Sequence, residues 1–455
     1  MSTSNVWVAP QHHRGLIRLV RKPSRWLLSA VLSAHFLAGG GASAQPAAPL
    51  EQLTLERAVQ LSLRHSRQLP AQDAMAESAR HMAVAAGQRP DLTLKLGINN
   101  LPVTGSDAFN LTNDFMTMAS IGVMRELTSA AKLKARSARF EREADVALAE
   151  RAMTQINLGR DTATAWLERH FQERMQALMG AQRDEARLQV EGAEATYRGG
   201  RGSQTDVFAA RALVAQIDER LQQIEQNIAV AKTRLSRWVG PQAHQPLAAA
   251  PDLTQVPLRS GGLEELLKSH PSLAVLEKQE GVARAEADVA QTEKKSDWSM
   301  ELMFSQRGPA YSNMVSINFS LPLQNNQASR QDRELAARLS RVEQLQAQRE
   351  EAVRERAAEA GARLQQWQGN RKRLDAYDRD LIPLAALRTQ AALAAYRGNG
   401  PLQAVLEARR MEIDTHLERL RLEMETAALW AQLNYLIAGG HDTTAVKTPA
   451  SSLEN

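Results

Sequence analysis

Carboxylate and guanidinium groups gather at two glycine-rich turns, and these residues are the first candidates for chemistry in the sequence. Asp206 lies shortly after a turn that begins at Tyr197, and Glu407 lies after a second turn that begins at Tyr396. Carboxylates at such positions can attract cations, or they can pair with nearby arginines at the surface. The remaining turn residues are Arg198, Gly199, Gly200 and Gly202 in the first turn and Arg397, Gly398 and Gly400 in the second.

The sequence holds no catalytic constellation. We find no nucleophile elbow, no phosphate-binding loop and no paired carboxylates that suggest a pocket, so we expect neither an enzyme nor a cofactor. Cysteine is absent, which removes disulfides and thiolate metal sites. Methionine thioethers could bind soft metals, but methionine is also an ordinary packing or lipid-facing residue, and no compact ligand set accompanies it. We therefore predict no metal site from the strand methionines Met116, Met118, Met300, Met303 and Met314.

The two turns belong to an internal repeat. The segment from Tyr197 to Arg211 is echoed, with one residue fewer, by the segment from Tyr396 to Arg409. In both segments we expect the glycines to adopt positive φ where two helices reverse direction. The chain is predicted to contain repeat 1 at 45–240, a proline-rich linker at 241–262 and repeat 2 at 263–439.

Each repeat is predicted to hold a short helix, a β-hairpin and a long helical hairpin. Alternation such as that of Leu92, Leu94, Leu96 and Ile98 places strands within about 91–125 and about 297–323. Coiled-coil helices are expected at about 129–238 and 328–438, and Pro383 should bend or locally break the long helix that precedes the second turn. The heptad seam is formed by Val207, Val214, Ile217, Leu221, Ile224, Ile228 and Leu235, and in the second repeat by Leu406, Ile413, Leu417, Leu420 and Met424.

The alternating strands allow two interpretations. In a water-soluble sheet the apolar row would face a core, whereas in a membrane it would face lipid around a wet lumen. Four strands cannot close a barrel, and a membrane does not tolerate open sheet edges. If these strands enter a membrane, several chains must share one barrel, with eight strands from two chains or twelve from three.

The N-terminus predicts export. A basic stretch, an apolar run from Trp26 to Ala38 and the small residues before Gln45 together describe a cleavable signal peptide at 1–44, cut near Ala44. No later stretch approaches the roughly 20 apolar residues of a membrane helix. The polar tail at 440–455 is expected to be flexible, and the scattered arginines give little support for nucleic-acid binding.

Several motifs carry a family resemblance across nearly all of the chain from Leu53 to Gly439. They are the helix entry at 55–58, the strand from Ser316 to Leu323, and both Tyr-Arg-Gly turns. In this combination the sequence resembles the TolC-like outer-membrane efflux channel family. The resemblance implies a mainly α fold with membrane β-strands, in which a homotrimer forms a 12-stranded β-barrel and an α-helical periplasmic tunnel. Segments 304–314 and 329–337 look like the heavy-metal branch of cobalt-zinc-cadmium or copper-silver type.

The resemblance also implies a function and partners. The chain would be the outer-membrane channel of a tripartite efflux system in a Gram-negative cell, exporting heavy-metal cations that a proton-driven inner-membrane pump delivers through a periplasmic adaptor. The turns would meet the adaptor, and Asp206 and Glu407 would form rings of three acids at the pore aperture. Ala404 stands where relatives carry an additional acid, and Met124 to Thr128 departs from the usual apolar, proline-containing strand exit.

Two alternatives remain beside this interpretation. An outer-membrane duct for type I protein secretion or drug efflux would share the fold and the turns but would serve a different pump. A soluble periplasmic coiled-coil scaffold would lack a barrel, and two amphipathic hairpins at equivalent positions argue against it.

Overall fold

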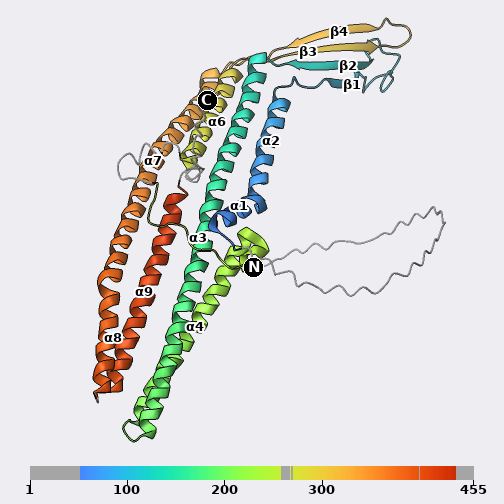
Figure 1. Cartoon of the computed structure of the whole chain (residues 1–455). Helices are drawn as coiled ribbons and strands as arrows, with labels where there is room; N and C mark the ends of the chain where they lie inside the picture. Colours follow the sequence, from blue (N-terminus) through green and yellow to red (C-terminus); the bar gives the residue numbers. More distant parts are fainter. Residues whose placement is uncertain (1–51, 258–266, 268–269, 399, 437–455) are drawn as a thin grey trace, which may run out of the picture. The chain divides into compact units, whose positions relative to one another are not determined.

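The computed structural model describes residues 52–257, 267, 270–398 and 400–436. The predicted signal peptide and tail lie outside the described residues. The first repeat holds α1 (Leu55–His65), α2 (Gln68–Ala86), β1 (Thr93–Asn99), β2 (Met118–Leu127), α3 (Ala130–Arg198) and α4 (Gln204–Val239). The second holds α6 (Pro271–Glu293), β3 (Trp298–Gln306), β4 (Met314–Ser320), α7 (Gln331–Ala376), α8 (Ile382–Arg397) and α9 (Leu402–Asn434) (Figure 1). The predicted order of elements thus occurs twice.

The four strands form one antiparallel sheet in the order β1-β2-β3-β4. The pairing of β2 with β3 joins the two repeats, since the other two pairings are hairpins within a repeat. Leu94 lies opposite Val123, which lies opposite Leu302, so residues of like polarity share a face along most of the sheet. Arg125, opposite Met300, is an exception near the helical end of the apolar face. In the described chain, β1 and β4 are left as edges with one unpaired side each.

The long hairpins are held by the predicted heptad seam. Ser129 and Ser203 cap the starts of α3 and α4 by accepting backbone N–H bonds, and such caps satisfy donors that a helix leaves unpaired. Ile217, Leu221 and Ile228 of α4 pack with Ile413 and the other α9 seam residues in one buried cluster, which confirms the seam. None of the helices in the described segments combines the length and hydrophobicity that a transmembrane helix requires.

The second long helix is interrupted where Pro383 predicted a break. A π-helical turn runs from Tyr377 to Leu381, and the N–H of Ile382 donates to the carbonyl of Tyr377 five residues earlier. Pro383 follows at the start of α8, where its missing N–H is tolerated. The i to i+4 hydrogen bonding of α7 therefore gives way to an i to i+5 bond just before the proline.

The main core lies where the helical hairpins meet the segment after α4. Trp166 is fully buried and its Nε1 donates to the carbonyl of Leu53 at 3.0 Å. The described part of the predicted linker packs against the helices. Leu247 forms an isolated parallel β-bridge with Leu53, and the carbonyl of Gln255 accepts a 2.8 Å hydrogen bond from Trp430 Nε1. Residues 258–262 of that linker lie outside the described part of the chain.

Arg169 of α3 is 2% exposed and forms hydrogen bonds to the segment that follows α4. Its guanidinium donates to the carbonyls of Ala243 at 2.6 Å and Gln245 at 2.8 Å, and its Nε bonds Glu173 at 2.8 Å. A buried charge is stable only when it is paired and hydrogen-bonded, as here. The arginine therefore acts as a polar clamp between α3 and the segment after α4.

We predict that Arg169→Met lowers the stability of the protein by about 3 kcal/mol, because it removes charged hydrogen bonds and leaves two carbonyls unpaired. The matched control is Arg183→Met on the same helix, whose arginine pairs only with the exposed Asp184; its change should stay within about 0.5 kcal/mol. Thermal unfolding of the purified protein measures both. Equal melting temperatures for the two variants would contradict the clamp.

Candidate functional site

The sheet exposes its apolar face on all four strands and shelters its polar face mainly on the central strands β2 and β3. Leu96 is 70% exposed and Val315 is 66% exposed, whereas Ser305 on the opposite face is 4% exposed. A sheet in a water-soluble protein buries its apolar row, so the arrangement is inverted here. The exposed apolar face comprises Leu94, Leu96, Ile98, Ile121, Val123, Met300, Leu302, Phe304, Val315, Ile317 and Phe319.

The polar face carries a hydrogen-bonded network across three strands. Lys95 of β1 forms an ion pair with Glu301 of β3, and the residue of β2 opposite Lys95 is Gly122. A Cβ on Gly122 would lie 2.7 Å from the carbonyl oxygen of Leu302, so the glycine permits close strand approach. Ser120 accepts bonds from Asn99 at 2.6 Å and from Ser305 at 3.3 Å.

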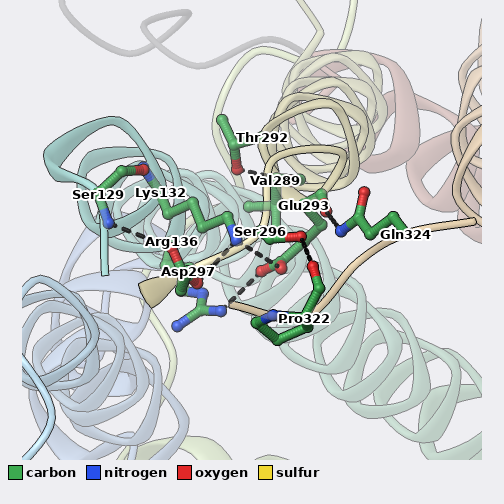
Figure 2. A network of polar contacts seen from close by, with 10 residues as sticks. All are labelled: Ser129, Lys132, Arg136, Val289, Thr292, Glu293, Ser296, Asp297, Pro322 and Gln324. Atoms are coloured by element: carbon green, nitrogen blue, oxygen red, sulfur yellow. Dashed lines mark hydrogen bonds and ion pairs between the residues drawn. The ribbon is translucent and has the colours of Figure 1, made fainter. Parts of the chain in front are cut away.

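A charged cluster lies where the strands meet the helices (Figure 2). Lys132 of α3 reaches Asp297, which precedes β3, at 2.7 Å and Glu293 of α6 at 3.4 Å. Arg136 bonds the other oxygen of Glu293 at 2.6 Å. The cluster thus ties the start of α3 in repeat 1 to the end of α6 in repeat 2.

Burial makes this junction cluster (Lys132, Arg136, Glu293 and Asp297) sensitive to loss of a partner. Lys132 is 2% exposed, and two basic groups face two acidic groups, so the charges balance. Desolvating a charge costs several kcal/mol unless its partners compensate. Removing Lys132 alone would leave a sheltered carboxylate without its lysine.

The same region explains the unusual strand exit at Met124 to Thr128. The backbone N–H of Ser129 donates to Asp297 at 3.3 Å, and the Ser129 hydroxyl accepts from the N–H of Lys132 at 3.4 Å. On the other strand exit, Pro322 accepts a bond from Ser296 and Gln324 donates to the carbonyl of Glu293 at 3.1 Å (Figure 2). Side-chain capping replaces the apolar exit in the first repeat.

The two glycine turns, called here the first tip (197–203) and the second tip (396–401), close by one shared device. The N–H of Gly202 donates to the carbonyl of Thr196 at 3.1 Å, and the N–H of Gly400 donates to the carbonyl of Ala395 at 2.8 Å. Both carbonyls belong to the residue before the tip tyrosine. The repeat seen in the sequence is therefore a repeat of backbone geometry.

The prediction of positive φ at the tip glycines is correct only at Gly200, whose φ is 73°. Gly199 and Gly398 have φ values of −78° and −89°. Gly202 and Gly400 serve close approach instead, because a Cβ there would lie 3.1 Å from the nitrogen of Tyr197 and 2.9 Å from the oxygen of Ala395. The tight chain reversal, and not left-handed backbone, requires glycine at these two positions.

The two acids near the tips differ in how they are engaged. Asp206 accepts from the backbone N–H and the hydroxyl of Ser203 at 3.1 and 2.7 Å, which completes a capping box at the start of α4. Glu407 is exposed on α9 and accepts only from Gln403, at 3.0 Å. No contact joins Asp206 to Glu407. Glu407 is thus the acid whose carboxylate is less engaged within the described chain.

The tips also differ in packing. Tyr396 is half-buried, and its hydroxyl lies 3.4 Å from the hydroxyl of Thr196 on the other hairpin, whereas Tyr197 is exposed. Arg211 of α4 pairs with Glu194 of α3 at 2.6 Å, and this hydrogen bond holds the pKa of Glu194 below its usual value. Arg198 and Arg397 make no ion pair within the described chain, so both remain available at the surface.

Ion pairs connect α9 to the first hairpin above the tips. Arg409 pairs with Glu185 of α3, and Asp414 pairs with Arg220 of α4 at 2.5 Å. Further along α9, Glu423 pairs with Arg174 of α3 at 2.8 Å. The two hairpins therefore meet through an apolar seam flanked by charges.

The π-turn is held to α9 by a second set of contacts. Arg419 binds both carboxylate oxygens of Asp378 at 2.8 and 2.9 Å, and these bonds lower the pKa of Asp378. Tyr377 donates to Glu418 at 3.1 Å. The break near Pro383 is thus a packed feature of the second hairpin.

Sequence reasoning missed the junction cluster, although a signal for it is present. Lys132 and Arg136 are four residues apart, and so are Glu293 and Asp297. Lys132 and Arg136 occupy one face of a helix, whereas Asp297 lies beyond the end of α6, and the two pairs have opposite charge. Among the described residues, no group of three or more His, Asp or Glu side chains is placed to hold a metal ion.

Comparison with known proteins identifies the fold. No protein-family model matches the chain, and no curated protein sequence matches it. The structure of CusC, described in terms of transmembrane channel formation, is 17% identical with a TM-score of 0.69, covering 85% of this chain and 92% of that one. The outer membrane protein VceC from Vibrio cholerae is 18% identical with a TM-score of 0.66, covering 84% and 95%.

A third similar structure is the open state of the MtrE outer membrane channel from Neisseria gonorrhoeae. It is 15% identical with a TM-score of 0.66, covering 85% of this chain and 89% of that one. At such identities the likeness establishes the fold, which is mainly helical with a small sheet, as predicted.

We predict that Lys132→Met lowers stability by about 3 kcal/mol, because Asp297 loses its buried partner. Lys134→Met on the same helix is the control, since Lys134 is exposed and makes no ion pair within the described chain. Denaturant unfolding of the purified protein distinguishes them. If the junction cluster did not stabilise the fold, both variants would have the same midpoint denaturant concentration.

We predict that Gly400→Ala loosens the second tip and that Gly398→Ala does not. The new Cβ at 400 would press on backbone at 2.9 Å and require a shift costing about 1 to 2 kcal/mol, whereas the Cβ at 398 meets ordinary contact at 3.4 Å. The rate of trypsin cleavage after Arg397 measures the opening. Equal cleavage rates in both variants would refute the close-approach role.

Proposed function

We propose that this chain is the outer-membrane channel of a tripartite efflux system and acts without catalysis. The observation that carries the proposal is the inverted sheet, whose apolar face is exposed on all four strands and whose polar face is sheltered on the central strands β2 and β3. Lipid outside and water inside would satisfy both faces at once. The fold shared with outer-membrane channels supports the same conclusion.

The strand lengths and aromatic residues fit this placement. The nine residues of β3 and ten of β2 would span a tilted path through the hydrocarbon layer. Trp298 is exposed at the helical end of β3, and Phe109, Phe115 and Tyr311 are exposed in the connections at the other end. Aromatic side chains at both boundaries are typical of membrane strands.

The open edges call for more than one copy. β1 and β4 each present unpaired backbone groups, which cannot remain unsatisfied in lipid. Three copies would close a 12-stranded barrel, and their long hairpins would continue it as a periplasmic tunnel. In this homotrimer the β4 edge of one copy would pair with the β1 edge of the next.

The tips would be the contact with a periplasmic adaptor and the aperture of the tunnel. Arg198 and Arg397, which make no ion pair within the described chain, and the exposed Tyr197 offer that surface. Three copies of Glu407 would form a ring that favours cations. The ion pairs of Arg409, Asp414 and Glu423 would resist opening until adaptor binding compensates for their loss.

The substrate we propose is a heavy-metal cation, delivered by a proton-driven inner-membrane pump. Support comes from the sequence segments at 304–314 and 329–337 and from the acid near each tip. The signal peptide at 1–44 would direct the chain across the inner membrane of a Gram-negative cell. Energy would come from the pump, and the channel would conduct passively.

Oligomer mass and single-channel conductance, measured on one detergent-extracted preparation, test the proposal. We predict a trimer with a cation-preferring conductance in planar bilayers. A water-soluble protein without conductance would instead support the coiled-coil scaffold.

Glu407 provides the selectivity test. Glu407→Gln should reduce the preference for cations over anions, because three carboxylates lose their charge, while Glu407→Asp should retain it. Reversal potentials in a salt gradient measure this preference. Identical selectivity in all three proteins would remove Glu407 from the aperture.

A further inference from the structure

The polar face of the sheet contains apolar side chains of one kind only. Its positions along the paired strands are otherwise Thr, Ser, Asn, Gly, Lys and Glu, and every larger apolar residue among them is methionine. The opposite face uses Leu, Ile, Val, Phe and Trp freely and includes one methionine, Met300. The polar-face methionines are Met118, Met124, Met303 and Met314.

The strand register spaces these methionines regularly. A rung is the set of directly opposed residues on one face; Met124 shares its rung with Glu301, and Met303 shares the next with Gly122. Met314 lies on the following rung, opposite Ser305, and Met118 on the one after, opposite Asn99. Each of four successive rungs therefore carries one methionine, about 7 Å from the next along the strands.

Neighbouring rungs bring methionines on adjacent strands into diagonal relation. Met124 on β2 and Met303 on β3 are offset by two residues, and so are Met303 and Met314 on β4. Diagonal neighbours lie within reach of long side chains. Two thioethers could therefore approach one ion between rungs.

The chemistry of the face favours a soft cation. Thioethers are soft ligands that select Cu(I)-like ions, and they need no deprotonation to bind. The polar face has no histidine or cysteine, and the carboxylate of Glu301 is already engaged by Lys95. Sites built from thioethers alone would bind an ion weakly. Weak binding suits conduction, because the ion must be able to leave each site.

Simple packing does not account for the choice of methionine. Leucine has nearly the same volume and is used on the apolar face of the same strands, so space filling alone would admit it. Met303 and Met124 are half-buried, and the residues directly opposite them are Gly122 and Ser316 for Met303 and Thr93 and Glu301 for Met124.

The register reverses the expectation from sequence that the strand methionines form no metal site. We propose that Met118, Met124, Met303 and Met314 form a thioether ladder that binds soft monovalent cations such as Ag⁺ or Cu⁺. The inference rests on the proposed function in one respect, that the polar face lines the conduit. The ladder would limit the transported substrate to soft monovalent cations, and it would place their successive binding sites on the polar face of the sheet. In a trimer each rung would carry three thioethers.

Silver provides the probe, because the chain has no cysteine to compete for it. We would titrate the detergent-extracted oligomer with silver nitrate in chloride-free buffer by calorimetry. The test variant carries Met→Leu at all four ladder positions, which removes sulfur and keeps volume. Met300→Leu, on the other face of β3, is the matched control.

The ladder predicts that the fourfold variant binds Ag⁺ at least tenfold more weakly, while Met300→Leu binds like the unmodified chain. Unchanged silver binding in the fourfold variant, or an equal loss in Met300→Leu, would overturn it. If the fourfold variant fails to assemble, the double variant Met124→Leu with Met303→Leu tests the diagonal pair on the two central strands, with a smaller loss expected. Unchanged binding there would likewise overturn the ladder.

A second readout separates this inference from the proposed function. In planar bilayers, Ag⁺ should reduce the potassium current of the unmodified channel and have less effect on the fourfold variant. A channel that conducts potassium but shows no methionine-dependent silver effect would reject the ladder and keep the channel. A chain that binds silver through the ladder methionines but never conducts would reject the channel and keep the site.

Discussion

The exposed apolar face of the four-stranded sheet is the constraint on which the other features depend. Eleven apolar side chains on it are two-fifths or more exposed, and each would gain about 1 kcal/mol from further burial. Their sum, about 10 kcal/mol, is comparable with the net stability of a whole domain. So large an exposed apolar area in water, together with the two open sheet edges, is why we propose that lipid covers this face and that further copies of the chain pair with the edges.

The junction cluster connects this sheet to helices that are held by different forces. The strands are fixed by register, and the hairpins by a heptad seam, so neither pattern alone sets the angle between them. Lys132 and Asp297 bridge the two repeats at the point where strands become helices. Because a buried ion pair favours one partner geometry over all others, it specifies the join more than it stabilises it.

Local patterns in the sequence predicted the helices and strands, but they did not predict contacts between residues far apart in the chain. The alternation at Leu94 and Leu96 gave the strands, the heptads around Ile217 gave the seam, and Pro383 marked the break. Sequence could not decide which sheet face is exposed, nor that Lys132 meets a residue 165 positions away. It also misjudged the tip glycines, since close approach at Gly400 depends on a carbonyl that only the folded turn brings near.

The central claim, that the apolar face meets lipid and the polar face meets water, is open to direct measurement. The absence of cysteine allows single spin labels along β4, at Val315, Ser316, Ile317 and Asn318, in protein reconstituted into liposomes. The account predicts collision with oxygen at 315 and 317 and with a water-soluble nickel chelate at 316 and 318. Equal accessibility to the chelate at all four positions would contradict it.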